Sequence, residues 1–129
     1  MKYAAVLAFS LSLAGGTIVA QREPVRTLLS KDLAGATGKE LLMITVEYPP
    51  GGSSPTHTHQ AQAMVYVLEG SIVMQSKGKA PVTLAPGQTW YEGLDDVHLV
   101  SRNASDSASA KYLVFMVKGK GAPILTPVK

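Results

Sequence analysis

Short apolar runs separated by turn residues follow one another along most of the chain. After residue 25 the runs are rich in Val, Ile, Leu and Tyr, and nearly every run is bounded by Gly, Pro, Asn or Asp, which is the pattern of strands and turns. The predicted strands span 25–33, 40–48, 63–69, 71–77, 81–85, 89–92, 98–102 and 111–118. This part shows no 3.6-residue period of a helix. The pattern therefore predicts one all-β domain over residues 21–129, an antiparallel sandwich or small barrel.

Alternation along 63–69 divides the side chains of this strand between two faces. Val65 and Val67 are expected to point into the barrel. The opposite face carries an apolar row, namely Met64, Tyr66 and Leu68. Such a row needs a second layer or a partner chain to cover it. We therefore expect a homodimer.

Two chain segments predict local shapes outside the strand interiors. Glu69 and Gly70 separate two strands, and Gly tolerates the positive φ of a two-residue hairpin, so a tight hairpin is predicted there. The tail 121–129 contains Pro at positions where regular pairing would end. We expect it to be an extended arm and not a core strand.

Residues 1–20 have the form of a secretory signal peptide. One Lys precedes an apolar stretch, and small residues follow up to Ala20. The apolar stretch is shorter than the roughly 20 residues of a membrane-spanning helix. Cleavage after Ala20 or Gly16 would release a periplasmic or secreted chain with no membrane anchor. A buried N-terminal helix is the alternative.

Composition excludes several kinds of chemistry. The 129 residues include no Cys, so disulfides and thiolate catalysis are ruled out. Lys and Arg together number 12 against 9 Asp and Glu, and they form no basic run interleaved with aromatic residues, so a nucleic-acid partner is not expected. Only three His are available for acid–base or metal chemistry.

Two of these histidines stand two residues apart at the start of a predicted strand. A period of two puts His57 and His59 on the same face, where two imidazoles can share one metal ion. A lone pair of this kind is a weak signal. The alternative is two exposed polar residues at a strand end.

The spacing around this pair is more specific than the pair itself. Gly51 is followed by five residues, His57-Thr58-His59, three residues, Ala63, six residues and Gly70. This spacing resembles the first motif of the cupin superfamily, in which a Glu stands at the position of Ala63.

The third histidine lies in a segment that resembles the second cupin motif. His98 stands at the motif position after Gly87. Gly93 replaces the usual Pro, Asp95 replaces the usual Gly, and Asn103 comes one residue late. All three histidines of the chain thus fall on the histidine positions of the two motifs.

The resemblance implies an antiparallel double-stranded β-helix, the jelly-roll barrel of cupins. It implies a divalent metal, Fe, Mn, Zn, Ni or Cu, held by His57, His59 and His98. A structural zinc takes four protein ligands, so a site of three favours catalysis or ligand capture. Because Ala63 removes the usual carboxylate, the ion would keep a vacant position for an anionic, chelating small molecule. Gln62 could reach the metal only through a β-bulge; otherwise it faces away from the site.

Glu92 is the carboxylate indicated by resemblance to the three-histidine cupins, which include dioxygenases that cleave acetylacetone. In those proteins a Glu at this offset from the third histidine lies near the metal. The resemblance implies that Glu92 orients substrate or water, or serves as a catalytic base. The alternative is an exposed glutamate in a turn.

The sequence favours a small divalent-metal enzyme, a dioxygenase- or isomerase-like cupin that acts on a small chelating oxygenated compound. A cupin that binds a small molecule or a metal without turnover is the second hypothesis. A surface protein whose site has decayed is the third, and it predicts no bound metal.

Overall fold

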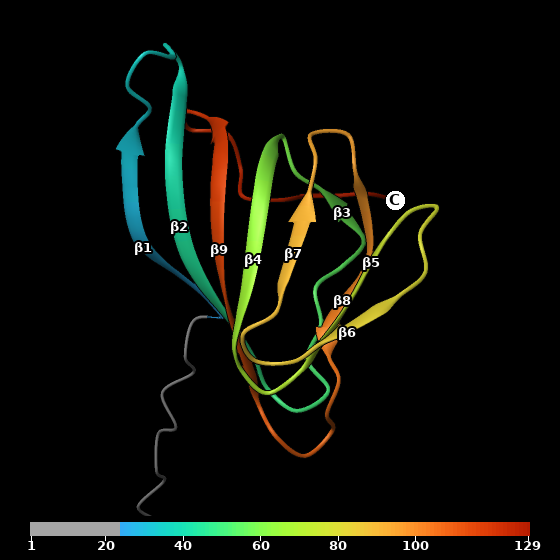
Figure 1. Cartoon of the computed structure of the whole chain (residues 1–129). Helices are drawn as coiled ribbons and strands as arrows, with labels where there is room; N and C mark the ends of the chain where they lie inside the picture. Colours follow the sequence, from blue (N-terminus) through green and yellow to red (C-terminus); the bar gives the residue numbers. More distant parts are fainter. Residues whose placement is uncertain (1–23) are drawn as a thin grey trace, which may run out of the picture.

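Ten β-strands make up the fold over residues 24–129, the part of the chain that this computed structural model describes (Figure 1). The strands are β1 (Val25–Asp32), β2 (Lys39–Tyr48), β3 (His57–Thr58), β4 (Ala61–Glu69), β5 (Ile72–Ser76), β6 (Val82–Leu84), β7 (Thr89–Glu92), β8 (Val97–Asn103), β9 (Ala110–Gly119) and β10 (Thr126–Pro127). The predicted signal peptide, 1–20, lies outside the described residues. Over 24–129 no helix is long and apolar enough to cross a membrane.

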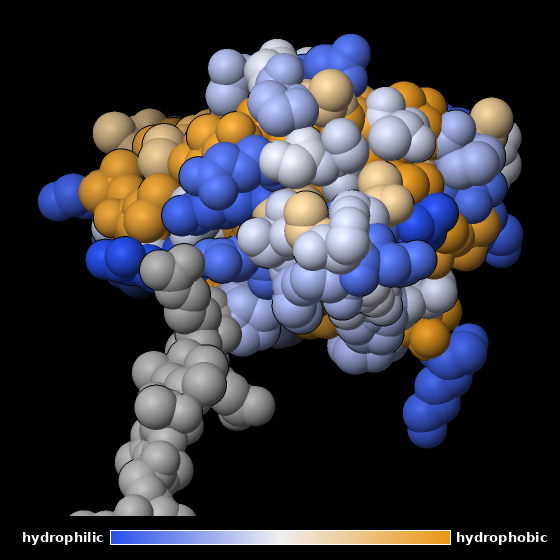
Figure 2. Space-filling model, turned by 90° about the horizontal axis from the view of Figure 1, so that it is seen from below, coloured by the Kyte–Doolittle hydropathy of each residue, from blue (hydrophilic) through white to orange (hydrophobic). Residues whose placement is uncertain are grey.

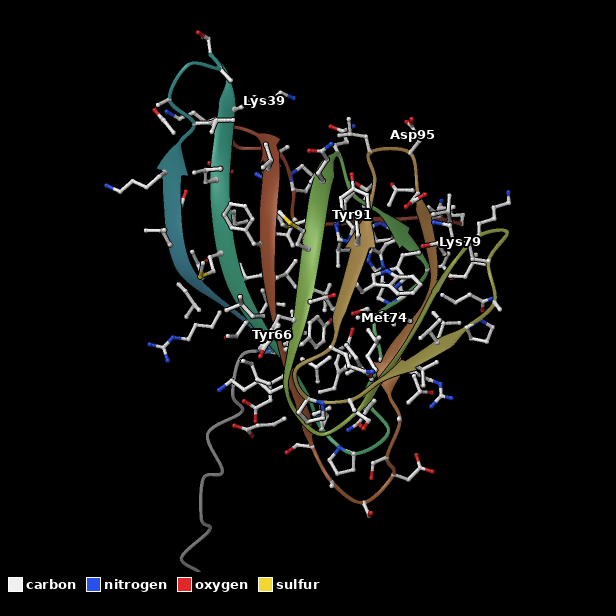
Figure 3. The ribbon with its side chains drawn as sticks, viewed as in Figure 1. Lys39, Tyr66, Met74, Lys79, Tyr91 and Asp95 are labelled. Carbon is white, nitrogen blue, oxygen red and sulfur yellow. The ribbon has the colours of Figure 1, made fainter. Side chains whose placement is uncertain are left out.

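The strands form two five-stranded antiparallel sheets. The first has the order β1-β2-β9-β4-β7 and the second the order β10-β3-β8-β5-β6. Apolar side chains from both sheets fill the space between them, and Met74 of β5 lies there (Figure 3). The largest apolar side chains that are fully buried in this core are Ile44, Val67, Ile72, Met74 and Met116. The all-β jelly-roll prediction is confirmed.

The two faces of the first sheet differ as the alternation along β4 predicts. Val65 and Val67 are buried, whereas Met64, Tyr66 and Leu68 are each about 40% exposed or more. The strand register extends this apolar surface into one row across all five strands. The row consists of Leu29, Met43, Phe115, Met64 and Tyr91.

The prediction of a tight hairpin at Gly70 is wrong. β4 belongs to the first sheet and β5 to the second, so Gly70 forms a corner between sheets. Its φ of 67° lies in the left-handed region, which glycine adopts without steric cost. A Cβ at this position would lie 2.6 Å from the carbonyl oxygen of Ser109. The glycine is therefore required by close packing as well as by its backbone angle.

The C-terminal segment crosses from one sheet to the other, as the red trace in Figure 1 shows. It leaves the end of β9 and pairs through β10 with β3. The amide of Val128 also donates a hydrogen bond to the carbonyl of Thr56. The segment is an extended arm, as predicted, and it adds a two-residue edge strand to the second sheet. Seen from below, the surface of the molecule has hydrophilic residues at its centre and hydrophobic residues on either side (Figure 2).

Candidate metal centre

Strand pairing brings the three histidines and Glu92 together. His57 of β3 lies directly opposite His98 of β8, and His59 follows β3 by one residue. Glu92 ends β7 in the first sheet, where it pairs with Ala63 of β4. The loop that holds Asp95 joins β7 to β8 at the upper end of the molecule (Figure 3). The site therefore lies toward that end.

One potential ligand atom from each of the four residues lies within 4.8 Å of the others. The Nε2 atoms of His57 and His59 are 3.0 Å apart. Glu92 Oε2 lies 3.1 Å from His59 Nε2, and Glu92 Oε1 lies 3.1 Å from His98 Nδ1. All four side chains are buried. A compact set of nitrogen and oxygen ligands such as this suits a divalent transition metal.

Main-chain carbonyls fix which ring nitrogens of His57 and His59 face the cluster. His57 Nδ1 lies 2.7 Å from the carbonyl oxygen of Pro55, and His59 Nδ1 lies 2.5 Å from that of Ile124. A carbonyl only accepts hydrogen bonds, so both Nδ1 atoms carry the proton when the rings are neutral. Both Nε2 lone pairs then point into the cluster. Metal-binding histidines are commonly oriented by such carbonyls.

When the rings are neutral, three hydrogen-bond acceptors therefore meet without a donor between them. The three acceptors are His57 Nε2, His59 Nε2 and Glu92 Oε2. His59 Nε2 lies 3.0 Å from His57 Nε2 and 3.1 Å from Glu92 Oε2. Glu92 Oε2 and both ring nitrogens of His98 are buried and make no hydrogen bond of good geometry. Buried polar atoms without partners are costly. A cation at this point would satisfy Glu92 Oε2 and one ring nitrogen of His98, so the residues present fit a bound metal ion.

The electrostatics of the metal-free cluster favour an ionised Glu92. Burial lowers the pKa of His57. Burial also opposes ionisation of Glu92, but the imidazoles of His59 and His98 beside it outweigh that effect and lower its pKa to about 2. Burial disfavours protonation of His59 too, yet the neighbouring Glu92 carboxylate raises its pKa. The cluster thus keeps an ionised carboxylate and draws positive charge toward it.

The structure brings four of the five predicted site residues together and leaves Gln62 outside the cluster. His57, His59 and His98 come together with Glu92, whose side chain lies within the ligand cluster and not in an exposed turn. Gln62 is not brought to the site. β4 has no bulge at this residue, so the Gln62 side chain is exposed on the outer face.

The position of Ala63, where the sequence predicts a vacancy beside the ion, lies next to Glu92. Ala63 is buried and small, and its partner in the neighbouring strand is Glu92. The carboxylate that the first motif lacks on β4 is thus supplied from β7 at the same level of the barrel. An ion here would meet three imidazoles and one carboxylate.

Two features of the site escaped prediction. The carbonyl of Ile124 orients His59, but a main-chain atom leaves no mark in the side-chain pattern. The cluster also faces a cavity of about 50 Å³ that is closed in part by Ile124 and Leu125 of the C-terminal arm. Its other lining residues are mostly apolar, with Tyr112, Ser54 and Ser101 as the polar exceptions outside the cluster.

Comparison with known families identifies the protein class. The model of the family described as "Cupin domain" matches residues 44–116. The matched segment includes all four residues of the cluster. The chain belongs to the cupin family.

Several solved structures share this fold. The DMSP lyase DddQ from Ruegeria pomeroyi is 21% identical with a TM-score of 0.66, covering 92% of this chain and 59% of that one. A cupin domain from Bordetella pertussis is 16% identical with a TM-score of 0.57, covering 74% and 92%. A predicted oxalate decarboxylase from Thermotoga maritima is 18% identical with a TM-score of 0.52, covering 69% and 91%.

A curated relative is similar over part of its length. The rhicadhesin receptor of Pisum sativum is 33% identical over an alignment of 72 residues that covers 52% of this chain and 33% of that protein. The chain spans about a third of the length of this relative. These similarities support the fold alone.

Proposed function

We propose that this cupin is a small divalent-metal enzyme, dioxygenase- or isomerase-like, that acts on a small chelating oxygenated compound. The observation that carries the proposal is the convergence of His57 Nε2, His59 Nε2 and Glu92 Oε2 with no hydrogen-bond donor between them. His98 adds a fourth side chain with unpartnered ring nitrogens. Fe, Mn, Zn, Ni or Cu would each accept this ligand set.

The chain's own residues supply the binding and the shape of the site. The three histidines and Glu92 would hold the ion, which would act as a Lewis acid toward a substrate oxygen. Pro55 and Ile124 keep two of the imidazoles in orientation through their carbonyls. Mostly apolar side chains line the cavity beside the cluster.

The cavity also limits the substrate. A volume of about 50 Å³ accommodates about four water molecules, so a bound compound has few non-hydrogen atoms inside the walls. Among the residues of 24–129 that line it there is no Lys or Arg. The attraction for an anionic oxygen would therefore come from the ion itself.

A cupin that binds a small molecule without turnover is the second candidate. Among the described lining residues outside the cluster, Tyr112 is the one titratable group. Burial raises its pKa well above 10, which makes it a poor base at neutral pH. If Glu92 is fully engaged by the metal, the cavity offers no other base. This observation favours binding over proton-transfer catalysis.

Elemental analysis of the purified protein tests the metal proposal. We expect about one equivalent of a transition metal, strongly reduced in His57→Ala and His98→Ala. Gln62→Ala is the matched control, because Gln62 is exposed away from the site, and it should retain the metal. Absence of metal from the unmodified protein after incubation with each candidate ion would refute the proposal.

Activity measurements then distinguish the proposed enzyme from the second candidate, a binding protein without turnover. Oxygen consumption and product formation would be followed for the metal-loaded protein with β-diketones, phenols and 2-oxo acids. Turnover that disappears in Glu92→Gln would support the enzyme. A metal-loaded protein that binds these compounds without converting them would support the second candidate.

We also propose that two copies associate through the outer face of the first sheet and that the chain acts in the periplasm or outside the cell. The apolar row across five strands supports the first proposal. The signal-peptide pattern of residues 1–20 supports the second.

A further inference from the structure

A cluster of hydroxyl groups forms a second polar region of the cavity. Tyr112, Ser54 and Ser101 line the cavity together with the metal-ligand cluster. Tyr48 lies behind them, and its hydroxyl contacts Ser54 Oγ at 2.5 Å and Ser101 Oγ at 2.9 Å. Tyr112 donates to Tyr48 at 3.0 Å. We call these four residues the hydroxyl cluster.

The hydroxyl cluster lies at a different level of the barrel from the metal-ligand cluster. His98 and Ser101 are both buried on β8 and are three residues apart, which corresponds to about 10 Å along a strand. Tyr112 likewise lies four residues before Met116, the residue level with Ala63 and Glu92. Apolar side chains form most of the wall between the two regions.

A count of hydrogens shows that the hydroxyl cluster has one donor to spare. Tyr112 donates to Tyr48, and Tyr48 has a single hydrogen for either Ser54 or Ser101. If it donates to Ser54, the hydrogen of Ser54 has no acceptor within the cluster. If it donates to Ser101, the hydrogen of Ser101 reaches only Tyr112 at 3.5 Å, the outer limit of a hydrogen bond.

We propose that the hydroxyl cluster binds a neutral oxygen atom of the substrate, a carbonyl, ether or hydroxyl oxygen, while an anionic end of the same molecule occupies the metal site. This inference rests on the proposed function and narrows its substrate class. The spare hydroxyl hydrogen supplies the donor. A second carboxylate is disfavoured, because no Lys or Arg lines the cavity to compensate its charge.

Isosteric probes of the metal-loaded protein test the inference. Calorimetry would compare 3-methoxypropanoate with pentanoate, which has a methylene group in place of the ether oxygen. We expect the ether to bind about three- to tenfold more tightly, as one net hydrogen bond provides. Pentanedioate, with a second carboxylate, should bind more weakly than the ether.

Substitutions in the hydroxyl cluster test whether it causes the tighter binding of the ether. The double substitution Ser54→Ala with Ser101→Ala removes both possible spare hydrogens, and the preference for the ether should fall to about one. Ser53→Ala is the control, because Ser53 is the exposed neighbour of Ser54, and it should keep the preference. Tyr112→Phe is a single, milder change that should reduce it.

The outcomes separate this inference from the metal proposal. Equal affinity for the ether and pentanoate, tighter binding of pentanedioate, or no binding of any probe to protein with a full metal content would overturn the inference and leave the metal site standing. An absence of metal in the unmodified protein would instead refute the proposed function. The wild-type comparison needs no variant and therefore does not depend on how well the double variant folds.

Discussion

The ionised carboxylate of Glu92 should make the stability of the metal-free protein depend on pH. Its pKa is about 2 in the folded protein against 4.5 for an ordinary carboxyl group. This difference corresponds to about 3 kcal/mol of folding free energy at pH values above 4.5. The side chain is 2% exposed, so solvent screening reduces this figure little. Glu92→Gln keeps the shape of the side chain and removes the charge.

The sign of the effect follows from the two partners. A lowered carboxyl pKa contributes stability that is present above pH 4.5 and lost as the pH falls through about 2. The raised pKa of His59 contributes stability that is present below 6.5 and lost as the pH rises through the raised value. The loss in Glu92→Gln should therefore be largest between about pH 4.5 and 6.5 and small near pH 2.

Urea unfolding in the presence of a chelator measures this difference. The free energy of unfolding would be extrapolated for the unmodified protein and for Glu92→Gln at several pH values. Glu69→Gln, a change of an exposed glutamate, is the control and should show little difference at any pH. A loss in Glu92→Gln that does not vary with pH, or a gain in stability at pH 5, would refute the electrostatic reasoning.

Three further outcomes are expected. Gly70→Ala should lower the melting temperature more than Gly78→Ala, because both have positive φ but a Cβ at Gly70 alone of the two meets main-chain atoms; equal effects would contradict the packing argument. Deleting residues 121–129 should weaken metal binding about 10- to 100-fold in a chelator competition, since it removes the carbonyl that orients His59; unchanged affinity would show that this contact is dispensable. Met64→Glu should shift the protein from dimer to monomer in light scattering, while an unmodified protein that is already monomeric would rule out the proposed dimer.

Local patterns in the sequence predict much of the fold. Strand positions follow from apolar runs between turn residues, and the alternation along β4 fixes which side chains are buried, as Val65 and Met64 illustrate. The spacing of His57, His59 and His98 also identified three residues that the structure brings together. These features depend on neighbours in the sequence or on a family motif.

Features that depend on long-range pairing were not predictable in the same way. The family resemblance indicated Glu92 as a site residue, but its place beside Ala63 depends on the register in which β7 pairs with β4. The corner at Gly70 depends on β5 leaving the first sheet, which a two-residue turn pattern does not reveal. The role of Ile124 belongs to its main-chain carbonyl, and any residue type could provide it.

The placement of the cluster has a consequence for the mechanics of the barrel. Glu92 belongs to the first sheet, whereas His57 and His98 belong to the second. An ion held by all four side chains would act as a cross-link between the sheets near one end of the barrel. Ion release and separation of the sheets would then be coupled motions, so the off-rate of the metal should follow the rate at which this end of the barrel opens. Hydrogen exchange of the β7 and β8 amides, with and without metal, would report that opening directly.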